Sequence, residues 1–98
     1  METQFGLSER ALDDIRALAK QYGIERVILF GSRARGDYRR TSDIDLAIEG
    51  GDTIRFTLDV EEKVWTLLTF DVVDLGRPVE RALKDSIQEE GIVLYEKV

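Results

Sequence analysis

Two acidic residues separated by one apolar residue are the first feature of this sequence that could support chemistry. Asp43 and Asp45 alternate with Ile44 and Leu46, and residues two positions apart in a β-strand point to the same face of a sheet. Two carboxylates held so close repel each other unless a cation lies between them. The spacing therefore predicts a strand that carries a metal site, although an ordinary half-exposed strand has the same alternation.

A glycine–serine pair is separated from these aspartates by ten residues. Gly31 and Ser32 directly follow the apolar run 27–30, which is typical of a buried strand. A turn there, opening a short helix at 32–35, would expose backbone N–H groups to an anion, and glycine lets a phosphate approach the main chain closely. The pair predicts a phosphate site beside the carboxylates, although Ser32 could also serve only as a helix cap.

A later acidic residue could complete the cluster. Asp71 and Asp74 both lie in the apolar run 69–75, which is expected to be a strand. They are three positions apart, so in a regular strand their side chains point to opposite faces. Only one of them can join the metal site, and the spacing alone does not say which.

The charge of the chain is uneven. Its formal net charge is −6, yet Arg33, Arg35, Arg39 and Arg40 fall within eight residues. An acidic chain binds nucleic acid poorly, because non-specific affinity comes from basic residues that neutralise phosphates. The basic loop therefore favours a local site for a small anion, and we expect at least two of the four arginines simply to be solvated.

The composition excludes several kinds of site. The chain has 98 residues, which suits one domain over 1–98, and it contains no histidine and no cysteine. Catalytic triads, His-ligated zinc and thiolate metal sites are therefore excluded, and a metal must be bound by oxygen, as Mg²⁺, Mn²⁺ and Ca²⁺ are. No apolar run reaches the roughly 18 residues of a membrane span and no signal peptide is evident, so we expect a cytoplasmic protein without membrane contact.

Helices and strands are expected to alternate along the chain. Ser8 is placed to cap the first helix, and Pro78 suits the first turn of the last one. Residues 1–6 are expected to be a loose end. The expected helices are 8–22, 53–68 and 78–90, and the expected strands are 27–30, 43–48, 69–75 and 92–95. This order predicts an α/β (α+β) fold in which helices pack on one sheet, with strand directions left open.

The helix expected at 53–68 has an unusually broad apolar arc. On a helical wheel the arc covers about 200°, more than a small domain can bury against one sheet. We therefore expect part of this segment to be a protein–protein surface, for a homo- or hetero-oligomer. The apolar residues of the arc are Ile54, Phe56, Leu58, Val60, Val64, Trp65, Leu67 and Leu68.

The segments FGSRARG (30–36) and SDIDL (42–46) resemble the signature of the polymerase-β-type nucleotidyltransferase superfamily, most closely that of its minimal nucleotidyltransferases. The resemblance implies a small mixed sheet of about four strands with helices packed against it. It also places the third acid early in the later strand, before an apolar pair, which selects Asp71. Asp43 and Asp45 would then bind two Mg²⁺ ions, or Mn²⁺, and Asp71 would complete the catalytic metal site and could accept a proton.

The same resemblance implies a nucleotide site. Gly31 and Ser32 would bind the terminal phosphates of ATP, and Arg33 and Arg35 are candidates to contact triphosphate oxygens. Gly31 would contribute through its backbone, and the arginines through positive charge.

Minimal members of this family are similar to antitoxins of two-gene modules whose partner is an all-helical HEPN-domain toxin. The resemblance implies transfer of AMP from ATP to a tyrosine of such a toxin. Two alternatives stay open: a small-molecule nucleotidyltransferase with a helical partner subunit, and a non-catalytic antitoxin that acts by binding alone. The acidic cluster favours an enzyme, because a pure binding protein gains nothing from carboxylates that repel each other.

Overall fold

The N-terminal residues form a hairpin where a loose end was expected. The computed structural model describes residues 3–98, and in them β1 (Thr3–Gln4) pairs antiparallel with β2 (Leu7–Ser8). The turn has positive φ at both Phe5 (60°) and Gly6 (70°), as a tight two-residue hairpin requires. Leu7 is buried in the core. The expectation was therefore wrong for residues 3–6, and residues 1–2 lie outside the described part.

A four-stranded sheet forms the centre of the fold. Its strands are β3 (Arg26–Phe30), β4 (Ile44–Glu49), β5 (Phe70–Asp74) and β6 (Ile92–Glu96). The spatial order is β5-β4-β3-β6, in which β4 and β5 are parallel while β3 runs antiparallel to both β4 and β6. The sheet is mixed, which confirms the predicted fold class.

The helices in residues 3–98 are α1 (Glu9–Gln21), α2 (Ser32–Arg35), α3 (Thr53–Lys63) and α4 (Arg81–Glu90). Ser8 caps α1 as predicted, since its hydroxyl accepts a hydrogen bond from the Ala11 N–H at 3.1 Å. Across the described residues, no helix combines the length and apolar character needed to cross a membrane.

Two helices are shorter than expected. Helix α3 ends at Lys63 and not at residue 68, because Val64 is extended (φ −73°, ψ 131°) and the next N–H, of Trp65, donates to Asp14 of α1 at 3.0 Å. Helix α4 begins at Arg81 and not at Pro78, because Glu80 keeps an extended backbone with ψ 136°.

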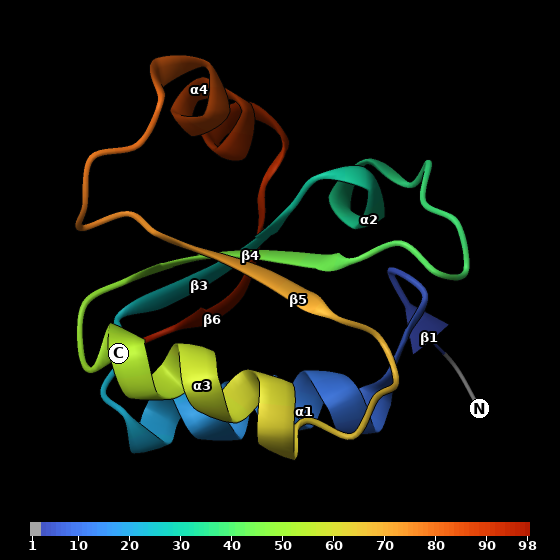
Figure 1. Ribbon diagram of the computed structural model, residues 1–98, viewed down its shortest axis with the longest axis horizontal. Coiled ribbons are helices and arrows are strands. Elements are labelled where there is room, and N and C mark those ends of the chain that lie inside the picture. The colour runs from blue at the N-terminus through green and yellow to red at the C-terminus, as the bar shows by residue number, and fades with distance from the viewer. Residues whose placement is uncertain (1–2) are drawn as a thin grey trace.

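The two faces of the sheet are covered unequally (Figure 1). Helices α1 and α3 lie together against one face, here called the packed face, where Val27, Leu29 and Leu46 join the main buried cluster. The opposite face, here called the open face, carries a much smaller buried cluster beneath α4. Its members are Ile28, Phe30, Ala47 and Ile87.

Candidate active site

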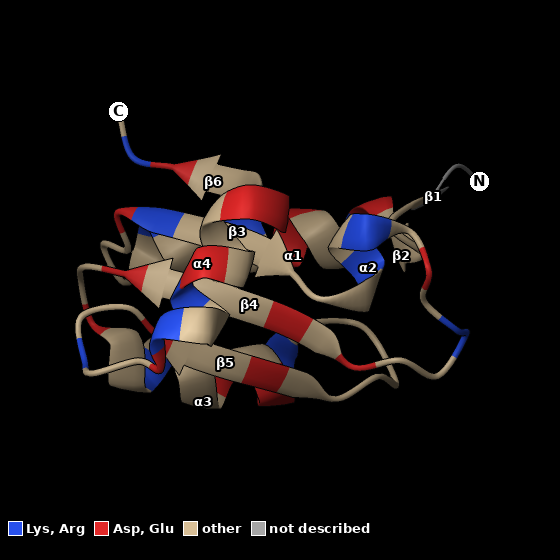
Figure 2. Cartoon of the chain, turned by 90° about the horizontal axis from the view of Figure 1, so that it is seen from above, with Lys and Arg blue, Asp and Glu red and all other residues tan. Residues whose placement is uncertain are grey.

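Asp45 and Asp71 lie opposite each other on neighbouring strands. They are Cα partners in the parallel pairing of β4 with β5, and residues paired in this way point to the same face of a sheet. Their neighbours Ile44, Leu46 and Phe70 belong to the buried cluster of the packed face. Both carboxylates therefore emerge on the open face, and Figure 2 shows the acidic segments of the two strands side by side.

Gly31 brings the chain directly against one of these carboxylates. It follows β3 with φ 74° and ψ −156°, and it forms the N-cap of α2 without any side-chain cap. A Cβ atom built at this position would lie 2.2 Å from Asp45 Oδ2. Only glycine allows both the positive φ and this close approach. The turn and the acid pair thus form one continuous site.

The pKa of Asp45 reflects burial and the negative charges around it. Burial of the carboxyl raises the pKa of Asp45, and the nearby charges of Asp71 and Asp43 raise it further. Arg35 and Arg33 oppose this shift. A carboxyl group with a raised pKa beside other acids is characteristic of a site that binds a cation or transfers a proton.

Asp43 has a hydrogen-bond partner of its own. Its Oδ1 accepts a hydrogen bond from the Thr69 hydroxyl, just before β5. Within residues 3–98, no three acidic side chains lie close enough together to form a ready metal site. A shared metal site of all three aspartates stays a prediction, and the charges of Asp71 and Asp43 both act on Asp45.

The donor chemistry still suits a divalent cation. The candidate ligands are carboxylates alone, and the chain offers neither histidine nor cysteine. Hard cations such as Mg²⁺ prefer oxygen ligands, and a cation would relieve the repulsion that raises the pKa of Asp45. The Thr69 hydroxyl occupies Oδ1 of Asp43, and the second oxygen of this carboxylate can still bind a cation.

Ser32 and Arg35 begin and end the short helix α2, which directly follows Gly31. Ser32 is the first residue of α2 and not its cap, since Gly31 holds the cap position. Arg35 is exposed, and its Nε lies 3.3 Å from Asp37 while its Nη1 lies 3.8 Å from Glu90 of α4. Its charge is the largest that counteracts the raised pKa of Asp45. A cation so close to the acids is suited to an anionic ligand.

Arg33 differs from the expectation that it contacts phosphate. Its side chain is only 2% exposed. The guanidinium donates to the carbonyl oxygens of Phe5 at 2.9 Å and Ser42 at 2.8 Å. A side chain committed to backbone carbonyls inside the fold is not presented to a ligand. Residue type did not reveal this, because a basic loop is ordinarily solvated.

Asp74, the other acid of β5, serves a structural purpose. Burial alone would raise the pKa of Asp74, but hydrogen bonds from the Gly76 N–H and the Thr53 hydroxyl, both at 2.8 Å, hold it below its usual range with help from Arg77. Asp74 therefore ties the end of β5 to the start of α3, while Asp71 pairs with Asp45 on the open face.

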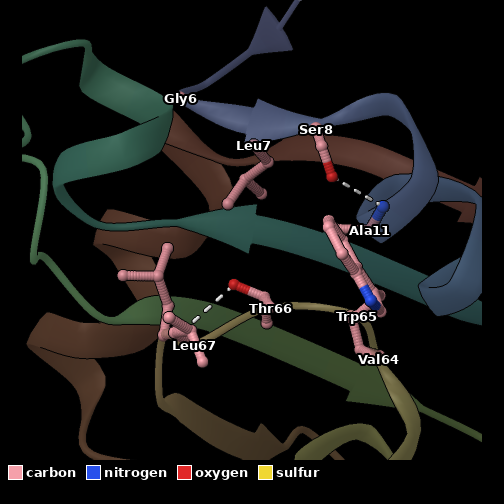
Figure 3. Close-up of a pocket in the computed structure, with 9 residues that line it drawn as sticks. Gly6, Leu7, Ser8, Ala11, Val64, Trp65, Thr66 and Leu67 are labelled. Atoms are coloured by element: carbon pink, nitrogen blue, oxygen red, sulfur yellow. Dashed lines mark hydrogen bonds between the residues drawn. The ribbon is translucent and has the colours of Figure 1, made fainter.

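An apolar groove lies away from these acids, between the β2–α1 segment and the loop after α3. Its volume is about 610 Å³, and Leu7, Ala11 and Val64 line it together with Trp65 and Leu67. Figure 3 shows the two segments facing each other across it. Because it contains none of the acidic residues, this groove is not part of the candidate active site.

Sequence comparisons place the chain in a family. Residues 13–98 match the family model described as Polymerase beta, Nucleotidyltransferase. Two proteins of Methanocaldococcus jannaschii, each provisionally named a protein adenylyltransferase, are 34% and 32% identical to the chain. The matches cover 89% and 74% of this chain and 97% and 81% of the relatives.

Comparisons with solved structures find chains of similar fold in toxin–antitoxin complexes. A chain in the crystal structure of a toxin–antitoxin with AMP-PNP is 26% identical, with a TM-score of 0.69 over 88% of this chain and 73% of that one. A chain in the complex of a tri-AMPylated Shewanella oneidensis HEPN toxin with its MNT antitoxin shares the fold, with a TM-score of 0.61, 22% identity and coverage of 89% and 71%. Together with the family match over residues 13–98, these comparisons show that the chain belongs to the polymerase beta nucleotidyltransferase family and is a nucleotidyltransferase.

Proposed function

We propose that this chain transfers AMP from ATP to a hydroxyl group of a protein partner, a tyrosine of a helical HEPN-type toxin, and thereby acts as an antitoxin. The observation that carries the proposal is the pairing of Asp45 with Asp71 on the open face, with Gly31 against Asp45. Relatives named as protein adenylyltransferases and similar chains from toxin–antitoxin complexes support the choice of acceptor.

The proposed reaction forms a bond between the acceptor oxygen and the α-phosphorus of ATP and breaks the bond from that phosphorus to the β-phosphate oxygen, so pyrophosphate leaves. Asp45 and Asp71 would hold the divalent cation, with Asp43 as a further ligand. Two Mg²⁺ ions, or Mn²⁺ in their place, would supply activation of the attacking hydroxyl and stabilisation of the leaving group. Asp71 accepts the proton that the acceptor hydroxyl releases.

The nucleotide is proposed to lie along the turn after β3. Backbone N–H groups at Gly31 and Ser32 face the terminal phosphates, and the exposed Arg35 supplies positive charge close to Asp45. Arg33 is left out of the phosphate contacts, because its guanidinium is buried against carbonyl oxygens.

The partner is proposed to dock on exposed apolar side chains of α3 and the loop after it. Ile54, Leu58 and Trp65 are each 61% exposed, and Leu67 is fully exposed. Large apolar side chains this exposed are typical of interaction surfaces. A Leu67→Asp variant is expected to bind the toxin at least tenfold more weakly. The control is Val93→Asp, the same kind of change at an exposed apolar residue of β6 outside this surface, which should bind the toxin like the wild type. Equal loss in both variants would contradict this docking surface.

The decisive experiment measures the intact mass of the partner. The chain is incubated with ATP, Mg²⁺ and its proposed partner, a helical HEPN-type toxin. We expect a mass gain in multiples of AMP on the partner. Because cation binding supplies several kcal/mol of transition-state stabilisation, Asp45→Asn is expected to slow the transfer about 1,000-fold or more. Asp85→Asn, which changes an exposed acid of α4, should transfer at the wild-type rate.

Each alternative has its own outcome in that experiment. Toxin neutralisation that is undiminished in Asp45→Asn would support an antitoxin that acts by contact alone and would contradict the catalytic proposal. Transfer of AMP to small hydroxylated compounds, with no mass gain on the partner, would support a small-molecule nucleotidyltransferase. A mass gain that disappears in Phe variants of single partner tyrosines would identify the acceptor.

A further inference from the structure

Arg33 is a buried cation among the described residues, and it makes no salt bridge within 3–98. Instead its guanidinium donates to backbone carbonyl oxygens: Phe5 at 2.9 Å, Arg40 at 3.3 Å, and Ser42 at 2.8 Å from Nη2 and 3.1 Å from Nε. Burying a charge without an ionic partner is costly. The planar guanidinium offsets this cost because it donates to several carbonyl oxygens at once. A lysine ammonium cannot reproduce this geometry.

These contacts join α2, which carries Arg33, to two other parts of the chain. Phe5 belongs to the turn of the N-terminal hairpin, while Arg40 and Ser42 belong to the loop between α2 and β4. The ring of Tyr38 lies over the guanidinium, with 4.9 Å from Arg33 Cζ to the ring centroid. Without such contacts a polar loop of this kind would be mobile.

The loop that Arg33 holds leads directly into the acid cluster. Ser42, which accepts two of the hydrogen bonds, immediately precedes Asp43. On the other side of Asp43, the Ile44 N–H donates to the Thr69 carbonyl at 2.9 Å. The backbone of Asp43 is therefore held from both sides, although its own side chain is exposed.

We propose that Arg33 is a positioning residue that sets the backbone of Asp43, so that this carboxylate can reach the cation held by Asp45 and Asp71. The inference rests on the proposed function, since it requires that the three aspartates bind a divalent cation. Arg33 acts through the Ser42 carbonyl and touches neither the cation nor the nucleotide. It also links the N-terminal hairpin to the site, because the same guanidinium binds Phe5.

The test measures binding of Mn²⁺ alone to the full chain, by the loss of the electron paramagnetic resonance signal of free Mn²⁺. The variant is Arg33→Lys, which keeps the charge and removes the fork. Replacing a residue that orients a metal ligand commonly weakens metal binding 10- to 100-fold, and we expect about tenfold here. The matched control is Arg40→Lys, the same change at an exposed arginine of the same loop, which should bind Mn²⁺ like the wild type.

A second variant covers the case in which Arg33→Lys does not fold, as judged by circular dichroism at the temperature of the binding assay. Tyr38→Leu leaves Arg33 and its hydrogen bonds in place but removes the stacked ring. The ring contributes one cation–π contact, whereas the hydrogen bonds of the buried guanidinium remain, so Mn²⁺ binding should weaken only about two- to fivefold. Tyr38→Leu with wild-type affinity would then overturn the inference.

The outcomes separate this inference from the proposed function. Folded Arg33→Lys with the wild-type affinity for Mn²⁺ would show a purely structural role and overturn the inference alone. An Asp45→Asn variant that binds Mn²⁺ as tightly as the wild type would overturn the metal site, and with it both proposals. Weakened Mn²⁺ binding in Arg33→Lys but not in Arg40→Lys would support the positioning role.

Discussion

The packed face and the open face of the same sheet obey different requirements. On the packed face, Val27, Leu29 and Leu46 are completely buried under α1 and α3. On the open face, the corresponding alternate positions include Asp45 and Asp71. The comparison teaches that one face supplies the apolar burial that stabilises the fold, whereas the other gives up burial to expose polar groups.

The largest expected difference between the faces is in stability. Phe56 of α3 is completely buried in the cluster of the packed face, whereas Leu83 of α4 is only partly buried beside the cluster of the open face. Phe56→Ala should lower the free energy of unfolding by about 3–5 kcal/mol, as for other buried aromatic residues. Leu83→Ala should lower the free energy of unfolding by roughly 1 kcal/mol, because folding removes only part of the Leu83 side chain from water. Urea unfolding monitored by circular dichroism measures both, and equal costs would break the comparison.

A second prediction concerns the turn where the open face meets α2. Gly31→Ala places a Cβ 2.2 Å from Asp45 Oδ2 and forces a positive φ on alanine. We expect a loss of about 2 kcal/mol in unfolding free energy, together with at least tenfold slower AMP transfer.

Gly36→Ala is the matched control for this prediction. Gly36 closes the same short helix at φ 94°, and a Cβ there meets no atom within 4 Å. It should carry the backbone cost alone and retain activity. If the two variants lost activity equally, the contact between Gly31 and Asp45 would not matter for catalysis.

A third prediction tests the acid that stabilises the fold. The lowered pKa of Asp74 means that its ionised form stabilises the folded state above the pKa of an unfolded aspartate. Asp74→Asn should therefore lower the free energy of unfolding by about 1–2 kcal/mol at pH 7, through weaker hydrogen bonds from Gly76 and Thr53. The difference should disappear as the pH falls through the folded-state pKa of Asp74, which chemical unfolding at several pH values would reveal.

The smallest expected effect has the opposite sign. The raised pKa of Asp45 means that the folded state binds the Asp45 proton more tightly than the unfolded state does. The stability of the fold therefore falls as the pH rises from the unfolded-state pKa of Asp45 through its folded-state pKa. In the presence of a chelator, Asp45→Asn should raise the melting temperature at pH 7 by a few degrees. The gain should vanish below the pKa of an unfolded aspartate, about 3.9. A lower melting temperature at pH 7 would show that Asp45 is not repelled by its neighbours.

Much of this arrangement could be predicted from residue pattern alone. The apolar run 27–30 and the alternation at 43–46 identified β3 and β4, because buried and half-buried strands have recognisable periods. The expectation that Asp71 and Asp74 point to opposite faces agrees with their different environments, since Asp71 is the register partner of Asp45 and Asp74 is tied to Thr53. The family signature selected Asp71 where spacing could not.

What pattern could not predict depends on contacts between distant segments. Helix α3 ends where the N–H of Trp65 donates to Asp14, a residue of helix α1. The N-terminal hairpin turns at Phe5 and Gly6, and phenylalanine is not a residue that signals positive φ. The burial of Arg33 depends on carbonyl oxygens from two separate loops. None of these partners is marked by local periodicity or residue type.

The parallel pairing of β4 with β5 has a further consequence for how the protein can fail. If β5 shifted along β4 by a single residue, Phe70 would move out to water and Asp71 would turn toward α1 and α3, since neighbouring strand residues alternate between faces. An incorrectly aligned chain would therefore lose its acid pair and expose apolar surface in one event. Quality control by chaperones and proteases would remove such molecules, and the soluble population would consist of molecules in which the two acids face each other.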